Sequence, residues 1–161
     1  MATTLRIGHG YDVHALRGGL PLVLGGVRIE HAKGCVAHSD GDVAAHALCD
    51  ALLGAAALGD IGLHFPDTSN EYKGADSVAL LRRVVELLAS HGYGVVNADV
   101  TIVMQTPKLR PYMDRMRGIL AQAMQVAAGV VSVKATTEEK LGFTGREEGV
   151  AAHAVVLIEK V

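Results

Sequence analysis

The sequence predicts a single α/β domain (α+β type) that spans residues 1–161, with helices packed on one face of a β-sheet. The length is the first reason, because 161 residues suit one domain. The composition is the second: 50% of the residues are hydrophobic but only 4% are aromatic, so we expect a core of Ala, Val, Leu and Ile. The third is the alternation of short apolar runs with segments of helical periodicity.

The composition also argues against several classes of protein. The formal net charge of −2 does not suit a nucleic-acid-binding module, which needs a basic patch. No apolar run reaches about 18 residues, so we expect no membrane span. The N-terminal stretch lacks the pattern of a signal peptide. Cys35 and Cys49 have no metal-type spacing and are expected to be free thiols, which indicates a cytoplasmic protein.

The first elements are predicted to be strands. Leu5–His14 reads as a strand in which Gly8 and Gly10 indicate a close backbone approach or a bulge. The runs Leu22–Leu24 and Val27–Ile29 flank a Gly-Gly pair and predict a hairpin.

A helix of small and apolar residues is predicted over residues 42–58, with Ser39 or Asp40 as its cap. Asp42, His46 and Asp50 recur every four residues and lie on one stripe of this helix. The stripe is either a solvated face or a buried polar row that needs partners, for which a metal ion is one candidate. The helix lacks Lys, Glu and Arg, which a solvated face normally carries.

The second half continues the alternation. Residues 63–74 are predicted to form a long loop. A helix then opens at Asp76 or Ser77 and ends at His91-Gly92. Strand 95–104, a turn over 105–110 and a third helix follow. The third helix carries a stripe that we assign to the core: Met113, Met116, Leu120 and Met124. Strand 130–135, a glycine-bearing polar loop over 136–146 and strand 150–158 complete the chain.

The last strand is apolar on both faces, apart from His153. A strand of this kind is usually covered on both sides. In a chain this small, we expect the second cover to be another copy of the same subunit, so that sheets of several subunits face each other.

Asp12 and His14 are two residues apart on a predicted strand, so their side chains point to the same face. With His46 they could form a three-ligand site with a fourth position open, the form expected of catalytic zinc. The alternative is that Asp12 pairs with a backbone amide and His14 lies on the surface.

The segment Lys134–Lys140 follows a predicted strand and could hold phosphate. Thr136 and Thr137 offer hydroxyls, and a carboxylate from Glu138 or Glu139 could share Mg²⁺ or Mn²⁺ with phosphate oxygens. The alternative is a solvated turn. Neither a P-loop nor a G-x-S-x-G motif is present in the sequence.

Five motifs can now be considered together: Gly8–His14, His38–Ala47, Asp50–Gly62, Phe65–Asp67 and Lys134–Arg146. In order and spacing they resemble the 2-C-methyl-D-erythritol 2,4-cyclodiphosphate synthase family over essentially the whole chain. The resemblance implies a homotrimer with active sites between subunits. It also implies a CMP-releasing, divalent-metal-dependent lyase of non-mevalonate isoprenoid biosynthesis. In its substrate, 4-diphosphocytidyl-2-C-methyl-D-erythritol 2-phosphate, the 2-phosphate attacks the β-phosphate and closes a cyclic diphosphate.

The resemblance also implies roles for residues at matching positions. Asp12, His14 and His46 match zinc ligands, and Glu139 matches the residue that holds Mg²⁺ or Mn²⁺. His38 and Thr137 match positions that stabilise the transition state. The implied substrate-binding residues are Asp12, Val13, His14, His38, Ser39, Asp60, Ile61, Gly62, Phe65, Pro66, Asp67, Thr68, Ser69, Met104, Gln105, Thr106, Pro107, Lys108, Leu109, Arg110, Thr136, Thr137, Glu138, Glu139, Phe143 and Arg146.

Three features depart from the family pattern. In the segment 104–110, which with Thr136 matches the family's cytidine diphosphate pocket, only Pro107 and Lys108 are close to that pattern. Glu138 replaces a small hydroxyl residue and adds negative charge beside the phosphates. The resemblance further implies a cavity on the three-fold axis, where Arg146 and a carboxylate on the last strand meet an isoprenoid diphosphate. The strand position is His153 in this sequence, so we expect binding in that cavity to depend on pH.

Two other functions fit parts of the sequence. A metal-dependent phosphohydrolase would let water attack the diphosphate instead. A non-catalytic trimeric scaffold would explain the apolar last strand, but it would leave Lys134–Arg146 and the segment at Phe65 without a purpose.

Overall fold

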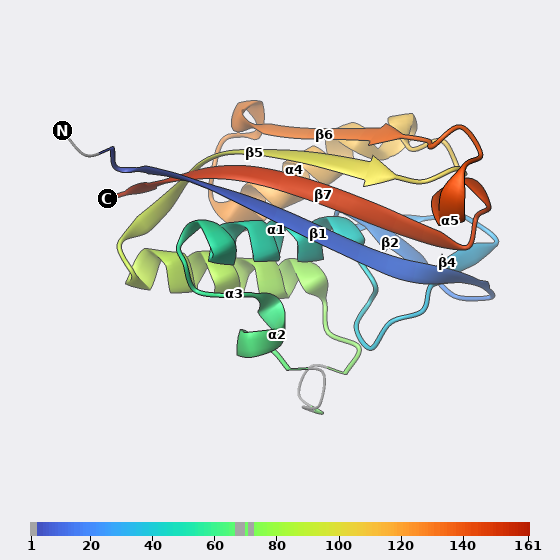
Figure 1. Ribbon diagram of the computed structural model, residues 1–161, viewed down its shortest axis with the longest axis horizontal. Coiled ribbons are helices and arrows are strands. Elements are labelled where there is room, and N and C mark those ends of the chain that lie inside the picture. The colour runs from blue at the N-terminus through green and yellow to red at the C-terminus, as the bar shows by residue number, and fades with distance from the viewer. Residues whose placement is uncertain (1–2, 67–69, 71–72) are drawn as a thin grey trace.

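A five-stranded sheet in the order β4-β1-β7-β5-β6 forms one layer of the molecule. The computed structural model describes residues 3–66, 70 and 73–161 (Figure 1). The strands of the described residues are β1 (Leu5–Gly18), β2 (Leu22–Leu24), β3 (Val27–Ile29), β4 (Lys33–Cys35), β5 (Tyr93–Val103), β6 (Val131–Thr136) and β7 (Gly149–Lys160). Only the β5–β6 pair is parallel, and β2 and β3 form a separate hairpin.

Helices form the second layer, behind the sheet in the view of Figure 1. They are α1 (Val43–Ala55), α2 (Ile61–His64), α3 (Ser77–Ser90), α4 (Met113–Met124) and α5 (Gly142–Gly145), with short 3₁₀ turns at Arg110–Tyr112 and Ala128–Val130. This is the mixed α/β domain that the sequence predicts. No helix among the described residues is long and apolar enough to cross a membrane.

The long elements and the β2–β3 hairpin agree with the sequence predictions, but three other short elements do not. The first strand runs four residues further than expected, to Gly18. Strand β4 pairs with the end of β1 and was not predicted. Helix α2 includes the first two residues of the predicted 63–74 loop, and helix α5 lies within the predicted 136–146 loop. The predicted cap of α1 was wrong: neither Ser39 nor Asp40 caps it, because the Asp42 carboxylate accepts from the first-turn amides.

Strand β1 and helix α1 approach so closely that only glycine fits between them. A Cβ atom added at Gly10 would lie 1.9 Å from the carbonyl oxygen of Ala47, and one added at Gly8 would lie 1.9 Å from that of Ala51. The predicted close approach is therefore confirmed. It brings the backbone of α1 directly against the strand that carries Asp12 and His14.

The core lies between the sheet and the helices. The inward face of β7 contributes its alternate residues, all of them buried: Val150, Ala152, Ala154, Val156 and Ile158. Met116, Leu120 and Met124 of α4 are also fully buried, and Met113 packs against them. The methionine stripe is thus part of the core, as predicted.

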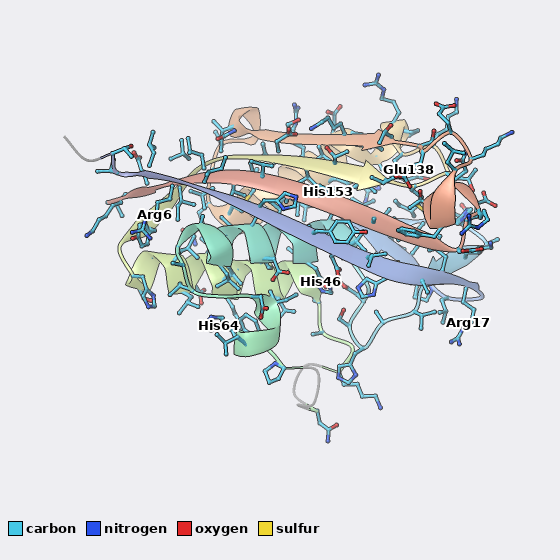
Figure 2. The ribbon with its side chains drawn as sticks, in the orientation of Figure 1. Arg6, Arg17, His46, His64, Glu138 and His153 are labelled. Atoms are coloured by element: carbon cyan, nitrogen blue, oxygen red, sulfur yellow. The ribbon has the colours of Figure 1, made fainter. Side chains whose placement is uncertain are left out.

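The other face of the sheet is open in the single chain. Ile7 is 72% exposed, and Leu5, Tyr11, Val13 and Val155 are also exposed apolar or aromatic residues. Figure 2 shows His153 in front of the strands on this face. Its Nδ1 lies 3.2 Å from His9 Nε2, and its ring centroid lies 4.8 Å from that of Tyr11. A small polar cluster therefore interrupts a largely apolar surface.

Candidate metal and phosphate site

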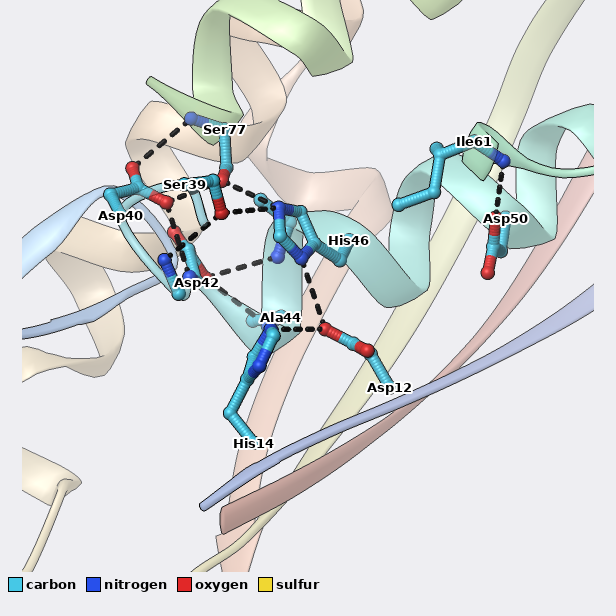
Figure 3. A network of polar contacts seen from close by, with 12 residues as sticks. Asp12, His14, Ser39, Asp40, Asp42, Ala44, His46, Asp50, Ile61 and Ser77 are labelled. Atoms are coloured by element: carbon cyan, nitrogen blue, oxygen red, sulfur yellow. Dashed lines mark hydrogen bonds and ion pairs between the residues drawn. The ribbon is translucent and has the colours of Figure 1, made fainter. Parts of the chain in front are cut away.

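Three side chains from two elements converge at the side of the sheet that faces α1. Asp12 and His14 project from β1, and His46 projects from α1 (Figure 3). Asp12 Oδ2 lies 3.0 Å from His46 Nδ1 and 3.1 Å from His14 Nε2. One donor atom from each residue lies within 4.8 Å of the others. The alternatives of a surface His14 and of an Asp12 paired with a backbone amide are thereby set aside.

Asp42, the first residue of the polar stripe on α1, holds neighbouring backbone in place and is not part of the metal cluster. The Asp42 side chain is fully buried. It accepts hydrogen bonds from the amides of Gly25 and Gly26, at 2.8 and 2.7 Å, and from those of Ala44 and Ala45, both at 3.1 Å. One carboxylate thus caps the helix and fixes the β2–β3 turn against it.

Asp50, at the other end of the stripe, is only partly buried and accepts from the Ile61 amide at 2.8 Å. Neither Asp42 nor Asp50 contacts an imidazole of the cluster in the described structure. Both hold neighbouring backbone instead. The solvated-face interpretation is wrong for Asp42 and His46, which are 0% and 7% exposed.

The charge distribution of the Asp12, His14 and His46 cluster favours a bound cation. Burial alone would raise the pKa of Asp12, but its interactions with the nearby His14 and His46 imidazoles outweigh this effect and lower that pKa to about 2. Burial would lower the pKa of His46, but the hydrogen bond to Asp12 and the nearby carboxylates raise it. Asp12 is therefore an anion at neutral pH, and positive charge is favoured between the three side chains.

The donor atoms fit a transition metal. His14 Nε2 is buried and lacks a hydrogen-bond partner among the described residues, although it lies close to Asp12. A buried polar atom without a hydrogen bond is costly, and a metal ion would satisfy it. One carboxylate oxygen with two imidazole nitrogens is a ligand set that zinc accepts.

A second region lies at the carboxyl end of β5 and β6. A cavity of about 940 Å³ is lined there by Met104, Gln105, Thr106, Pro107, Lys108, Leu109, Arg110, Met113, Asp114, Arg117, Gly129, Val131, Ser132, Val133, Lys134, Ala135, Thr136 and Thr137. It includes residues 104–110 and Thr136, which the resemblance assigns to a cytidine diphosphate pocket, together with Thr137, which the resemblance assigns to stabilising the transition state. The structure therefore brings these predicted residues together.

The segment after β6 places the remaining phosphate-binding candidates at the surface. Glu139 has a φ of 53° and donates its amide to Thr137 Oγ1 at 3.3 Å. Thr144 donates its hydroxyl to the Glu138 carboxylate. Phe143 and Arg146 are exposed, and the Arg146 guanidinium pairs with Glu148 at 2.9 Å.

Other predicted residues flank the metal cluster. His38 is exposed, and Ser39 Oγ lies 3.4 Å from His46 Nε2. Asp60 caps α2 by accepting from the Leu63 amide. Of the other residues predicted to bind substrate, Val13 lies on the open face of β1. Four more lie in or just after α2: Ile61, Gly62, Phe65 and Pro66. Asp67, Thr68 and Ser69 lie outside the described residues.

Within one chain these two regions are separate. The residues that line the cavity include neither Asp12, nor His14, nor His46 in the part of the chain that the structure describes. The cluster belongs to β1 and α1, whereas the cavity is lined by β6, the segment after β5 and the first half of α4.

Sequence reasoning missed two residues beside His46. Ser77, predicted only as a helix start, has its Oγ 2.7 Å from His46 Nε2, and Asp40 accepts from the Ser77 hydroxyl (Figure 3). Ser77 is 31 positions from His46, so no spacing rule relates them. A serine in the first turn of a predicted amphipathic helix was the only signal in the sequence.

A model of the YgbB family matches residues 5–159. The chain belongs to the YgbB family. A protein named 2-C-methyl-D-erythritol 2,4-cyclodiphosphate synthase, from Thioalkalivibrio sulfidiphilus (strain HL-EbGR7), is 68% identical over 155 residues, which cover 96% of this chain and 97% of that protein. The five motifs quoted above fall within the residues matched to the YgbB family, and the resemblance is confirmed.

Solved structures show the same fold. The bifunctional IspDF from Campylobacter jejuni matches with a TM-score of 0.95 and 41% identity, over 99% of this chain and 43% of that one. A CDP-bound form of 2C-methyl-D-erythritol-2,4-cyclodiphosphate synthase matches with a TM-score of 0.88 and 40% identity, over 96% of this chain and all of that one. The architecture of this YgbB family member is therefore that of its solved relatives.

Proposed function

We propose that this chain converts 4-diphosphocytidyl-2-C-methyl-D-erythritol 2-phosphate to 2-C-methyl-D-erythritol 2,4-cyclodiphosphate and CMP, as a divalent-metal-dependent lyase of non-mevalonate isoprenoid biosynthesis. The observation that carries the proposal is the convergence of Asp12, His14 and His46 in a YgbB family member that is 68% identical to a synthase of that name. The free thiols of Cys35 and Cys49 support a cytoplasmic location.

Asp12, His14 and His46 would hold Zn²⁺, and Glu139, with the substrate phosphates, would hold Mg²⁺ or Mn²⁺. When bound, these ions supply positive charge that neutralises the diphosphate and favours departure of CMP. The support for zinc is the oxygen and two-nitrogen donor set with the orphaned His14 Nε2. The support for Glu139 is its exposed carboxylate beside the hydroxyl-bearing end of β6.

The chain's own residues position the substrate. The cavity of residues 104–110 and 129–137 is large enough for a nucleotide, and Lys108 brings positive charge to it. We assign His38 and Thr137 to stabilising the charge that develops on the phosphates. No general base is required, because the attacking 2-phosphate is already anionic and belongs to the same molecule as its target.

We further propose a homotrimer in which one subunit supplies the metal cluster and its neighbour supplies the cytidine cavity. The separation of these two regions within one chain supports this arrangement. The open apolar face of the sheet, with Ile7 and Val155 exposed, supports packing of sheet against sheet between subunits.

In this trimer, three copies of His153 would line a cavity that accepts an isoprenoid diphosphate with Arg146 nearby. The groups around His153 are His9 and Tyr11 on β1, with Asp99 and its partner Lys134 on β5 and β6. His9 Nε2 and His153 Nδ1 lie 3.2 Å apart, and a ring N–H of this imidazole pair would donate a hydrogen bond to the diphosphate. We expect tighter binding at about pH 5.5 than at about pH 8 by calorimetric titration; equal affinity would contradict this assignment.

The test of the activity is the product. The purified protein is incubated with the substrate and Mg²⁺, and the reaction is followed by phosphorus NMR. Two coupled diphosphate signals together with CMP are expected. A linear diphosphate or free phosphate would indicate a hydrolase and contradict the cyclase.

The test of the metal cluster is the variant His46→Ala. Because two ligands are too few to retain the ion, zinc measured in the purified variant should fall to background, with the oligomer intact by size-exclusion chromatography. Full zinc occupancy in this variant would refute the ligand set.

A further inference from the structure

We propose that Ser77, supported by Asp40, is a positioning residue that keeps the proton of the His46 imidazole on Nε2 and so directs Nδ1 toward the bound metal. The inference rests on the metal site of the proposed function. It adds to that site a side chain from α3, an element that contributes none of the three proposed zinc ligands.

The contacts around Ser77 define the direction of its hydrogen bonds. Ser77 is fully buried, and its Oγ lies 2.7 Å from His46 Nε2. Its hydroxyl proton is donated to Oδ1 of Asp40, and Oδ2 of Asp40 accepts from the Ser77 amide at 3.1 Å. A serine hydroxyl carries one proton. Because that proton is directed to Asp40, the oxygen can only accept from His46.

This arrangement selects one tautomer of His46. Nε2 must carry a hydrogen in order to donate to Ser77 Oγ, which leaves Nδ1 as the nitrogen with a free lone pair. Nδ1 lies 3.0 Å from Asp12 Oδ2, on the side where the three donor atoms converge. The Ser77 contact therefore leaves the lone pair of Nδ1 directed toward the position of the proposed metal ion.

Asp40 holds Ser77 from a fixed turn. The Asp40 amide donates to the Ala75 carbonyl at 3.2 Å, and Asp40 Oδ1 accepts from the Asp42 amide at 3.1 Å. One carboxylate thus ties the N-terminus of α3 to the turn before α1. Ser39 Oγ is a weaker partner of His46 Nε2, at 3.4 Å, and accepts from the Gly41 amide at 3.2 Å.

The experiment compares zinc binding and the His46 ring nitrogens in four full-length chains: unchanged, Ser77→Ala, Ser77→Thr and Ser90→Ala. Ser90 is the matched control, because it is a serine of the same helix whose hydroxyl donates only to local groups at the far end. Zinc affinity is measured by competition with a chelator, and nitrogen-15 NMR identifies the protonated ring nitrogen in the zinc-loaded protein.

For Ser77→Ala we expect a loss of zinc affinity of about 10- to 100-fold, the usual effect of removing a partner that orients a metal-bound imidazole. The Nε2–H signal should also lose its protection from solvent exchange. Ser77→Thr keeps the hydroxyl and should restore both, and Ser90→Ala should change neither. A purely structural role would lower the melting temperature and leave the His46 nitrogen signals unchanged.

A Ser77→Ala variant that binds zinc with unchanged affinity, or that keeps an unchanged Nε2–H signal, would overturn the inference. That result would leave the proposed cyclase activity untouched, because the activity is tested separately on the unchanged chain. Failure of Ser77→Thr to restore affinity would also overturn the inference. If the unchanged chain bound no zinc, the metal site itself and this inference would both be refuted, whatever the fold.

Discussion

At the scale of single residues, burial decides what each polar group can do. Asp42 is fully buried, which raises the pKa of its carboxyl, whereas hydrogen bonds from backbone amides offset part of this effect. Its four amide contacts fall on two separate segments, the start of α1 and the turn after β2. Asp76 caps α3 with a similar side chain but contacts only that helix.

Replacing Asp42 should therefore cost far more than replacing an ordinary cap. We expect Asp42→Ala to lower the free energy of unfolding by about 3 kcal/mol or more, because it removes a cap and leaves the amides of the buried Gly25 and the partly buried Gly26 unpaired. Asp76→Ala should cost about 1 kcal/mol. Urea denaturation of both variants measures the difference, and equal losses would contradict the anchoring role of Asp42.

The two cysteines should be unreactive in the folded chain. Burial, followed by the negative charge of Asp42, raises the pKa of the Cys35 thiol to about 12, and burial also raises that of Cys49. A thiol reagent at about pH 8 should modify both only after unfolding, because the thiolate is the reactive form. Rapid modification of the native protein would contradict this expectation.

The raised pKa values of the two thiols also predict that the folded chain becomes less stable at alkaline pH. The unfolded chain loses its thiol protons near pH 9, whereas the folded chain retains them until its raised pKa is reached. The unfolded state then binds fewer protons, so the contribution of these thiols to stability is present below pH 9 and declines above it. Serine at both positions should reduce this decline in denaturation curves between about pH 8 and about pH 11.

At the scale of elements, the packing of β1 on α1 determines how the cluster is built. Gly8 and Gly10 lie against the carbonyls of Ala51 and Ala47, with no room for a further carbon. Glycine weakens strands and helices elsewhere because it is flexible, but here its missing side chain permits the contact.

Gly10→Ala should therefore destabilise the fold by at least about 3 kcal/mol, because the added methyl must push the strand from the helix. Gly118→Ala is the control: a Cβ at Gly118, in the middle of α4, would meet nothing within 4 Å. That substitution should stabilise by about 0.5–1 kcal/mol. A Gly10→Ala melting temperature close to that of the unchanged chain would show that the contact can relax.

The sequence predicted elements and site residues where a local pattern existed. Helix 42–58 and the strands before and after it had clear periodicity, and the two-residue spacing placed Asp12 beside His14. Strand β4 and helices α2 and α5 were missed, because three or four residues cannot display a period and no Gly-Gly turn marks them as one marks β2 and β3. Asp40 was predicted to cap α1, but its carboxylate accepts from the amide of Ser77 at the start of α3. Tertiary contact, and not distance along the sequence, decides which helix it contacts.

At the scale of the whole molecule, one face of the sheet is covered by helices and the other is not. The uncovered face carries exposed apolar side chains on β1 and β7. The cytidine cavity and the metal cluster also lie apart on the chain. A second copy that covers the open face and completes the site would account for both observations.

Ile7→Glu should accordingly disrupt the assembly, because a carboxylate would be buried between sheets. Light scattering should give about three times the 16.8 kDa of one chain for the unchanged protein, and a lower mass for the variant. Leu63→Glu is the control, since Leu63 is 70% exposed but lies on α2, away from the sheet. Retention of the full mass by Ile7→Glu would contradict the proposed interface.

The glycine contact between β1 and α1 has a consequence for how this protein can vary. Asp12 and His14 belong to strand β1, and His46 belongs to helix α1. The distance between the two backbones, which are in direct contact at the glycines, therefore determines the distance between the proposed ligands. No residue is smaller than glycine, so this gap cannot be narrowed by substitution, and any replacement widens it. Replacement of Gly8 or Gly10 can therefore only increase the separation between β1 and α1, and with it the distance from Asp12 and His14 to His46.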